Sequence, residues 1–423
     1  MPRRYGCNRY NRGAFGFKPD AMNLPLATPV PFATAARMDD IESFYAMEIA
    51  REAYELARQG RSIIAINVGA PDFAAPPAVM DAADAAIRRG DTHYTVALGI
   101  QPLREAISGH YLRHYGLEVP AARIAVTAGA SGAMLIAFGT QVNPGDEWLM
   151  PDPTYPCNRR FVSLYGGMTR LIPCGPALNY QLTADLVERH WGPKTRGVMV
   201  ATPSNPTGTT VTPTEMRAIH AVVRAHDGVL LVDEIYHGLT YERDAAGGFR
   251  NETSVLANGE DVIVVNSFSK YFNMTGWRLG WMVVPETHMK AVEKLAQNLF
   301  ICPSTLAQHA ALACFEPATL AVYEERRAEF ARRRDYFVPA LRELGFGIAG
   351  TPAGAFYVYA DVSQFATDSF RFCHDLLHAT GVAITPGRDF GDVDASKHVR
   401  MTYTVDVAQL REVVARVKRF LER

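Results

Sequence analysis

The sequence predicts an α/β protein, in which helices cover both faces of a mainly parallel sheet and a smaller α+β region follows. Short apolar segments alternate with helical segments through the middle of the chain, which is typical of strands buried on both faces. From about residue 320 the pattern changes to a long charged helix and shorter mixed segments. Polar residues directly follow several of the apolar segments, and ligand sites in such sheets lie at the carboxyl ends of the strands.

The expected large domain spans residues 81–319. Helical patterns such as 131–142 and 213–227 separate its apolar segments and indicate crossover helices. Together they predict a three-layer αβα domain. The predicted strands are 123–127, 147–151, 196–202, 229–234, 261–268 and 280–284.

Two further regions flank this domain. Residues 1–37 are rich in Arg, Gly, Asn and Pro, which predicts an extended or partly disordered arm. A transit peptide, or a true start at Met22 or Met38, is an alternative interpretation of this arm. A helical pattern begins at Asp40 and ends at Gly60. Residues 38–80 are expected to pack with 320–423 as a small α+β domain.

The composition of the chain argues against several classes of function. The chain has 423 residues and a formal net charge of −1, so no electrostatic argument favours nucleic acid or an anionic membrane as a partner. No apolar run reaches transmembrane length. The six cysteines are scattered without metal-ligand spacing, which predicts reduced thiols, no metal and a cytoplasmic location.

Lys270 stands at the end of the predicted strand 261–268, among hydroxyl and aromatic residues. An apolar environment disfavours the charged form of a lysine, which lowers the pKa of the amine and makes it nucleophilic. A single lysine is far more often a surface residue than a catalytic one. Two other predicted strands also end in polar residues, which favours a catalytic Lys270.

Asp233 directly follows four aliphatic residues, and a buried carboxylate is costly unless it is paired. It therefore requires a cation or a strong donor, and Tyr236 lies on the same side if a helical turn begins there. Asn205 follows another strand, where Pro206 and Gly208 favour a tight turn. Taken singly, a buried capping Asp and a simple strand-end turn also explain these residues.

An anion site is predicted from two segments. Small residues around Ala130 and Ser131 lie between a strand and a helix, where backbone N–H groups can hold a phosphate, although close helix packing also requires small residues. Arg278 adds a planar guanidinium suited to phosphate. Ser267 and Ser269 add hydroxyl donors.

These motifs resemble those of the fold type I, pyridoxal-phosphate-dependent aminotransferases of class I/II, which are the aspartate aminotransferase-like family. The resemblance covers residues 40–423, and the segment 267–280 matches the Schiff-base lysine signature of the family along its whole length. The supporting motifs, in the expected order, are NVGAPDF (67–73), HYTVALGIQPLREAI (93–107), TAGASGA (127–133), DPTYP (152–156), PSNPTG (203–208), DEIY (233–236) and VRMTY (399–403).

The resemblance implies pyridoxal 5′-phosphate as the cofactor and a ping-pong exchange between an amino acid and a 2-oxo acid. Lys270 would form the Schiff base and move a proton between the substrate Cα and the cofactor C4′. Asp233 would pair with the pyridine nitrogen and keep it protonated. Tyr236 and Asn205 would hydrogen-bond the 3′-oxygen, and Tyr155 would stack on the ring.

The resemblance also implies which residues bind the substrate α-carboxylate and the cofactor phosphate. Arg400 would bind the substrate α-carboxylate through two parallel bonds, assisted by the backbone at Gly69. Tyr94 matches a tyrosine that reaches the phosphate of the neighbouring subunit, which implies a homodimer with shared active sites. The groups that would hold the phosphate are Ser267, Ser269, Arg278 and the backbone around Ala130 and Ser131.

Departures from the family pattern concern the substrate. Ala70 follows Gly69 where an acidic or amide residue is more usual, and Asn273 replaces a small residue. No arginine is identifiable for a distal carboxylate, so an aspartate preference is neither supported nor excluded.

Three alternatives keep the fold but change the function. A C–S β-lyase, cyclase or decarboxylase would share nearly all of these residues. A ligand sensor of a transcription regulator would need a helix-turn-helix domain, and the 37 residues before the motifs show no two-helix pattern. A catalytically dead binding protein conflicts with the presence of Lys270, Asp233 and Arg400.

Overall fold

The computed structural model describes residues 33–39 and 41–422 and divides the chain into two units, 1–42 and 43–423. Among the described residues of the first unit, a 3-10 turn spans Ala36–Met38, and residues 33–39 are exposed. Residues 1–32, most of the predicted arm, lie outside the described residues. The second unit contains all the strands and α-helices described below.

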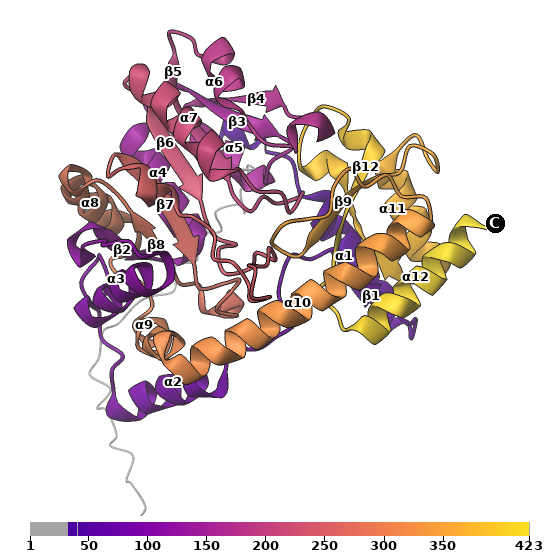
Figure 1. Ribbon diagram of the computed structural model, residues 1–423, viewed down its shortest axis with the longest axis horizontal. Coiled ribbons are helices and arrows are strands. Elements are labelled where there is room, and N and C mark those ends of the chain that lie inside the picture. Colours follow the sequence, from indigo (N-terminus) through magenta and orange to yellow (C-terminus); the bar gives the residue numbers. More distant parts are fainter. Residues whose placement is uncertain (1–32, 40, 423) are drawn as a thin grey trace, which may run out of the picture. The chain divides into compact units, whose positions relative to one another are not determined.

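The second unit is built from α-helices that alternate with strands (Figure 1). Within the described residues, no helix combines the length and the apolar composition needed to cross a membrane. The helices are α1 Tyr45–Arg58, α2 Pro77–Arg89, α3 Gln101–Tyr115, α4 Gly129–Gln141, α5 Pro156–Leu164, α6 Ala184–His190, α7 Pro213–Ala225, α8 Met289–Phe300, α9 Thr305–Leu312, α10 Pro317–Glu343, α11 Ser369–Thr380 and α12 Val407–Leu421.

A seven-stranded sheet forms the centre of the unit, in the order β2-β8-β7-β6-β5-β3-β4. Only β8 is antiparallel to its neighbours, so the predicted mainly parallel sheet is confirmed. The edge strand β4 was not predicted. The strands are β2 Ile124–Thr127, β3 Glu147–Asp152, β4 Met168–Pro173, β5 Thr195–Ala201, β6 Val229–Asp233, β7 Val262–Ser267 and β8 Gly280–Val283.

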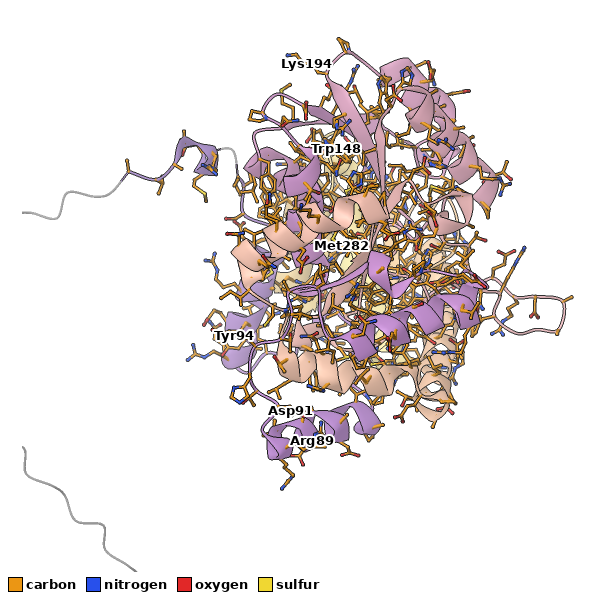
Figure 2. The ribbon with its side chains drawn as sticks, turned by 90° about the vertical axis from the view of Figure 1, so that its left-hand side faces the viewer. Arg89, Asp91, Tyr94, Trp148, Lys194 and Met282 are labelled. Atoms are coloured by element: carbon orange, nitrogen blue, oxygen red, sulfur yellow. The ribbon has the colours of Figure 1, made fainter. Side chains whose placement is uncertain are left out.

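Both faces of this sheet are buried. On β6, Leu230 and Val232 belong to one apolar cluster, whereas Leu231 belongs to another that includes Trp148 and Met282. Figure 2 labels Trp148 and Met282 within the densely packed interior. Alternation along a strand places successive side chains on opposite faces, so the two clusters are the two helix-covered sides of the sheet. This is the three-layer α/β architecture that the sequence predicts.

Smaller sheets lie beyond the main sheet, near α1, α11 and α12 (Figure 1). Strands β11, β12 and β9 are antiparallel, and β1 pairs with β10 in parallel. The long helix α10 packs against α12 at this end of the unit. The strands are β1 Ile64–Ala65, β9 Tyr357–Asp361, β10 Val382–Ala383, β11 Thr385–Pro386 and β12 His398–Thr402.

Helix α1 begins later than the sequence predicts. Its first helical residue is Tyr45, not Asp40. The carboxylate of Asp389 accepts hydrogen bonds from the backbone N–H groups of Tyr45 and Ala46, both at 2.8 Å. These N–H groups have no partner inside the helix, so a carboxylate far away in sequence defines its start.

Candidate active site

A cavity of about 330 Å³ lies at the carboxyl ends of the main-sheet strands and is closed by residues from β9 and β12. All the predicted site residues except Tyr94 line this cavity. They are Gly69, Ala130, Ser131, Tyr155, Asn205, Asp233, Tyr236, Ser267, Ser269, Lys270, Arg278 and Arg400.

Lys270 lies three residues after β7 ends, and its Nζ donates a hydrogen bond of 2.6 Å to the backbone oxygen of Gly69. Burial, together with the positive charges of Arg400 and Arg278, lowers the pKa of Lys270 to about 8, and the nearby Asp233 opposes this only in part. Because all three effects disfavour the protonated form, a larger share of the amine is neutral and nucleophilic near neutral pH.

Asp233 and Glu234 extend from the end of β6 in different directions. Asp233 lines the cavity, and its Oδ1 accepts a hydrogen bond from the backbone N–H of Ile235 at 3.0 Å. Burial raises the pKa of Asp233 to about 7, which shows that its charge is undercompensated. Glu234 is fully buried and accepts hydrogen bonds from Ser254 and Val255 instead. Of the two carboxylates, only Asp233 is available to a ligand in the cavity.

Helix α4 and Arg278 form a cradle for an anion. No side chain caps the N-terminus of α4, so its first N–H groups are available. Arg278 lies beside them and donates to the hydroxyl of Ser269 at 3.4 Å. Gly129, with φ of +71°, allows this approach, because a Cβ there would lie 2.6 Å from Nη2 of Arg278.

We expect Gly129→Ala to weaken cofactor binding about tenfold or more. The new methyl group would displace the Arg278 guanidinium and would also be strained by the positive φ. A titration of the apoenzyme with pyridoxal phosphate measures the effect. Gly276→Ala is the matched control, because a Cβ at Gly276 meets nothing within 4 Å. An unchanged dissociation constant in Gly129→Ala would show that the cradle does not bind the cofactor.

Arg400 is held rigidly on β12. Its guanidinium lies between the rings of Tyr357 and Phe390, 4.7 and 4.8 Å from their centres. It donates to Oδ1 of Asn205 at 3.0 Å and to the backbone oxygen of Asn67 at 2.6 Å, while its buried Nε has no partner. A fixed guanidinium with an unused donor is suited to a carboxylate. Because Oδ1 of Asn205 is occupied, the group that Asn205 can offer to a ligand is its N–H₂ donor.

Tyr236 pairs with a residue that the sequence analysis missed. Its hydroxyl lies 2.7 Å from the hydroxyl of Tyr357, and burial is the main cause that raises the pKa of both tyrosines. A Cβ at Gly69 would collide with the hydroxyl of Tyr357, so the glycine backbone approaches this pair closely. Tyr357 comes from an aromatic-rich strand whose alternation predicts burial but not a partner.

Other cavity residues were also missed. Asn67 lies inside the quoted motif 67–73, so its position was a usable signal. Asp389 and Phe390 come from a loop with no recognisable pattern. Asn273 does not line the cavity, and it bonds Arg326 on α10 through its Oδ1 at 2.7 Å. Its positive φ of 53° is one that asparagine tolerates, which accounts for this departure from the family pattern.

Tyr94 is far from the cavity of its own chain. The residue is 81% exposed and lies at the surface, on the segment that joins α2 to α3 in the sequence (Figure 2). The loop that carries it is well anchored: the carbonyl of His93 accepts from Thr305 at 2.7 Å, and Gln308 bonds Thr95 and Ile100. An anchored loop therefore presents an exposed aromatic ring.

The donor set of this cavity fits pyridoxal phosphate. The uncapped helix end and Arg278 match a phosphate, the undercompensated Asp233 matches a protonated pyridine nitrogen, and the deprotonatable Lys270 matches an aldehyde. Arg400 lines the same cavity, where its guanidinium matches a second, carboxylate-bearing molecule.

Comparisons with known proteins agree with this geometry. The family model described as "Aminotransferase class I and II" matches residues 61–417. A valine–pyruvate aminotransferase of Mycobacterium tuberculosis is 39% identical over 381 residues, which cover 90% of this chain and 97% of the relative. A crystal structure of an aminotransferase from Mycobacterium tuberculosis is also similar, with a TM-score of 0.88, 39% identity and coverage of 93% and 100%. The aspartate aminotransferase of Thermus thermophilus with maleate has a TM-score of 0.85, 32% identity and coverage of 92% and 100%.

The chain therefore belongs to the aminotransferase class I and II family. The fold, the enzyme class and the cofactor implied by the motifs are confirmed: it is a pyridoxal-phosphate-dependent aminotransferase.

Proposed function

We propose that the cavity around Lys270 transfers the amino group of an amino acid with an uncharged side chain to a 2-oxo acid, in a ping-pong cycle that uses one site for both. The observation that supports this most strongly is the convergence of Lys270, Asp233 and Arg400 on one cavity. When bound, the cofactor supplies an electron sink for the charge left at the substrate Cα.

Each residue has a distinct role in this proposal. Arg400 binds the α-carboxylate through its fork and thereby fixes the orientation of the substrate. Lys270 holds the cofactor and, once released, moves a proton at the substrate Cα. Asp233 keeps the pyridine nitrogen protonated, and this new cation would in turn lower the pKa of Asp233.

The remaining cofactor contacts follow from position. We assign Tyr236 and the amide of Asn205, which line the cavity, as donors to the 3′-oxygen, and Tyr155, the residue before α5, as the side chain that stacks on the ring. The phosphate is held by Ser267, Ser269, Arg278 and the N–H groups at Ala130 and Ser131.

The lining of the cavity supports an uncharged side chain. Apolar residues contribute much of it, among them Phe44, Met47, Val68 and Phe161. Among the described lining residues, the cations are Lys270, Arg278 and Arg400, and all three have roles already. A distal carboxylate would find no further cation among the described residues that line this cavity. The name of the valine–pyruvate relative is consistent with this preference.

Steady-state turnover with a panel of donors tests the proposal. With pyruvate as acceptor, valine, leucine or phenylalanine should give kcat/KM at least about tenfold above aspartate, because an unpaired carboxylate in an apolar site is costly. A reversed order would contradict the substrate class. Omitting the acceptor should stop turnover, whereas continued release of ammonia would favour the lyase alternative.

The assembly in this proposal is a cytoplasmic homodimer. Tyr94 and Val96 expose large apolar surface on an anchored loop, which is typical of a protein contact. Tyr94 would then reach the phosphate held by the neighbouring subunit. Within each subunit, we propose residues 81–319 as the large domain, and 38–80 with 320–423 as the small domain.

A further inference from the structure

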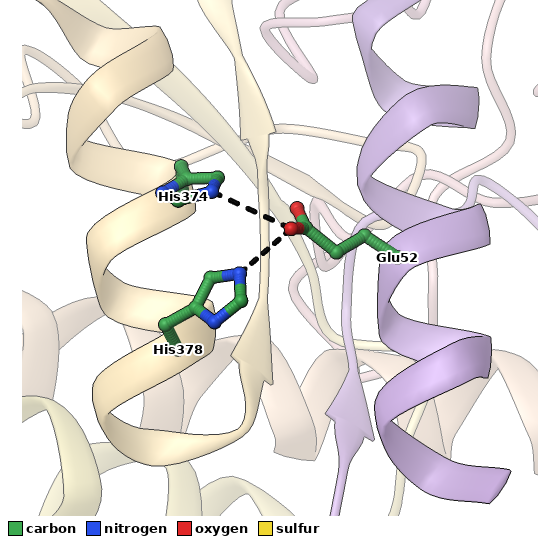
Figure 3. A group of neighbouring side chains, drawn as sticks. All are labelled: Glu52, His374 and His378. Atoms are coloured by element: carbon green, nitrogen blue, oxygen red, sulfur yellow. Dashed lines mark hydrogen bonds and ion pairs between the residues drawn. The ribbon is translucent and has the colours of Figure 1, made fainter. Parts of the chain in front are cut away.

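We propose that Glu52, His374 and His378 form a binding site for one divalent transition-metal ion such as Zn²⁺, which fastens helix α1 to helix α11. The three side chains belong to helices far apart in the sequence, and each offers one ligand atom. These atoms lie within 4.8 Å of one another (Figure 3). Two imidazoles and one carboxylate are an established ligand set for zinc, with water in the fourth position.

The distances from Glu52 to the two histidines are close to those between the ligands of a bound ion. Nε2 of His378 lies 2.7 Å from Oε1 of Glu52, and Nε2 of His374 lies 3.4 Å from the same oxygen. Ligand atoms around tetrahedral zinc lie about 3.3 Å apart at ordinary bond lengths. The histidines are four residues apart on α11, which places them on one face, and Figure 3 shows both rings directed at the carboxylate.

A second carboxylate lies beside one of the rings. Nδ1 of His374 lies 3.5 Å from Oδ1 of Asp375, whereas Nε2 of the same ring lies 3.4 Å from Oε1 of Glu52. An orienting carboxylate behind a ligand histidine is a common feature of metal sites.

The site is accessible from solvent. The side chains of Glu52, His374 and His378 are 34, 44 and 40% exposed, so an ion can enter and water can complete its coordination.

The ion would act on the substrate cavity through α1. The first turn of this helix is fixed by Asp389, and the neighbouring residues Phe44, Ala46 and Met47 line the cavity. Glu52 lies about two turns further along the same helix. A metal bridge at Glu52 would therefore hold the distal half of α1 on α11. It would stabilise the position of the helix without touching the cofactor.

Equilibrium dialysis of the untagged, chelator-treated holoenzyme against Zn²⁺ tests the site. We expect one Zn²⁺ per chain in the wild type, and a loss of at least about tenfold in affinity in Glu52→Gln, His374→Gln or His378→Gln. His226→Gln is the matched control, because it removes a surface histidine that pairs with a single carboxylate, Glu188, at 3.1 Å. Basal activity without zinc reports that each variant is folded.

Thermal unfolding gives an independent reading. Zinc should raise the Tm of the wild type and of His226→Gln, but not that of a His374→Gln, His378→Gln double variant. Zinc bound at a cysteine or at the cofactor phosphate would persist in the double variant. Equal zinc affinity in the double variant and the wild type would therefore overturn the proposal. Failure of the wild type to bind zinc would also overturn the proposal. The three side chains would then be a cluster of surface ion pairs only.

Discussion

Replacement of Lys270 by alanine is expected to reduce kcat by about 10⁴-fold or more, while the cofactor still binds. In the proposed function this variant loses both the amine that holds the cofactor and the group that moves the proton at the substrate Cα. The cradle of Arg278 and α4 is untouched, so the phosphate keeps its contacts. Single-turnover kinetics and cofactor content, measured on the same preparation, separate these two effects.

Lys290 provides the control for this variant, because it is an exposed lysine on α8 away from the cavity. Lys290→Ala should keep full activity. In the wild type, reconstitution of the apoenzyme should accelerate as the pH rises through about 8, since the neutral amine is the reactive form. Substantial turnover in Lys270→Ala would refute the assignment.

Replacement of Arg400 by alanine is expected to lower kcat/KM by about 100-fold or more for every amino acid donor. In the proposed function the guanidinium binds the α-carboxylate, which all donors share, so the relative preference among the donors should not change. Part of the loss comes from Asn205, whose Oδ1 would lose the donor that now orients its amide. Donor-dependent kinetics with several amino acids measure both the size and the uniformity of the effect.

Arg400→Lys keeps the charge and loses the fork, so it should recover only a minor part of the lost activity. Cofactor affinity should stay near the wild-type value in both variants, because the proposal assigns the phosphate to Arg278 and not to Arg400. A loss confined to one donor would contradict the role of Arg400 as the clamp for the α-carboxylate.

The central sheet could be predicted because most of its strands are continuously apolar and are separated by segments with a helical pattern. Strand β4 was missed because it lies at the edge of the sheet, where Thr169 and Arg170 interrupt the apolar pattern. The start of α1 was misplaced for a different reason. The free N–H groups of its first turn donate to the carboxylate of Asp389, which lies more than 300 residues away in the sequence.

The residues of the candidate site could be predicted where a charged side chain stands at the end of an apolar strand. Asp233 and Lys270 stand out because a charge at the end of a buried strand requires an explanation. Tyr357 and Phe390 do not stand out, because an aromatic residue in an apolar strand or loop is ordinarily core. Their contacts with Tyr236 and Arg400 depend on how β9 and β12 close over the main sheet.

The same limit applies to the metal site. His374 and His378 have helical spacing, but nothing in the sequence around them indicates that Glu52 lies opposite. Only the packing of α1 on α11 brings the carboxylate to the two rings.

The most direct test of the account is the absorption spectrum of the purified holoenzyme during addition of an amino acid and then of a 2-oxo acid. We expect the visible band of the lysine-bound cofactor to disappear with an uncharged amino acid such as valine, with one equivalent of 2-oxo acid released per site. Pyruvate should restore the band. A spectrum that does not respond to any amino acid, or a band that recovers with release of ammonia and without an acceptor, would contradict amino-group transfer at Lys270.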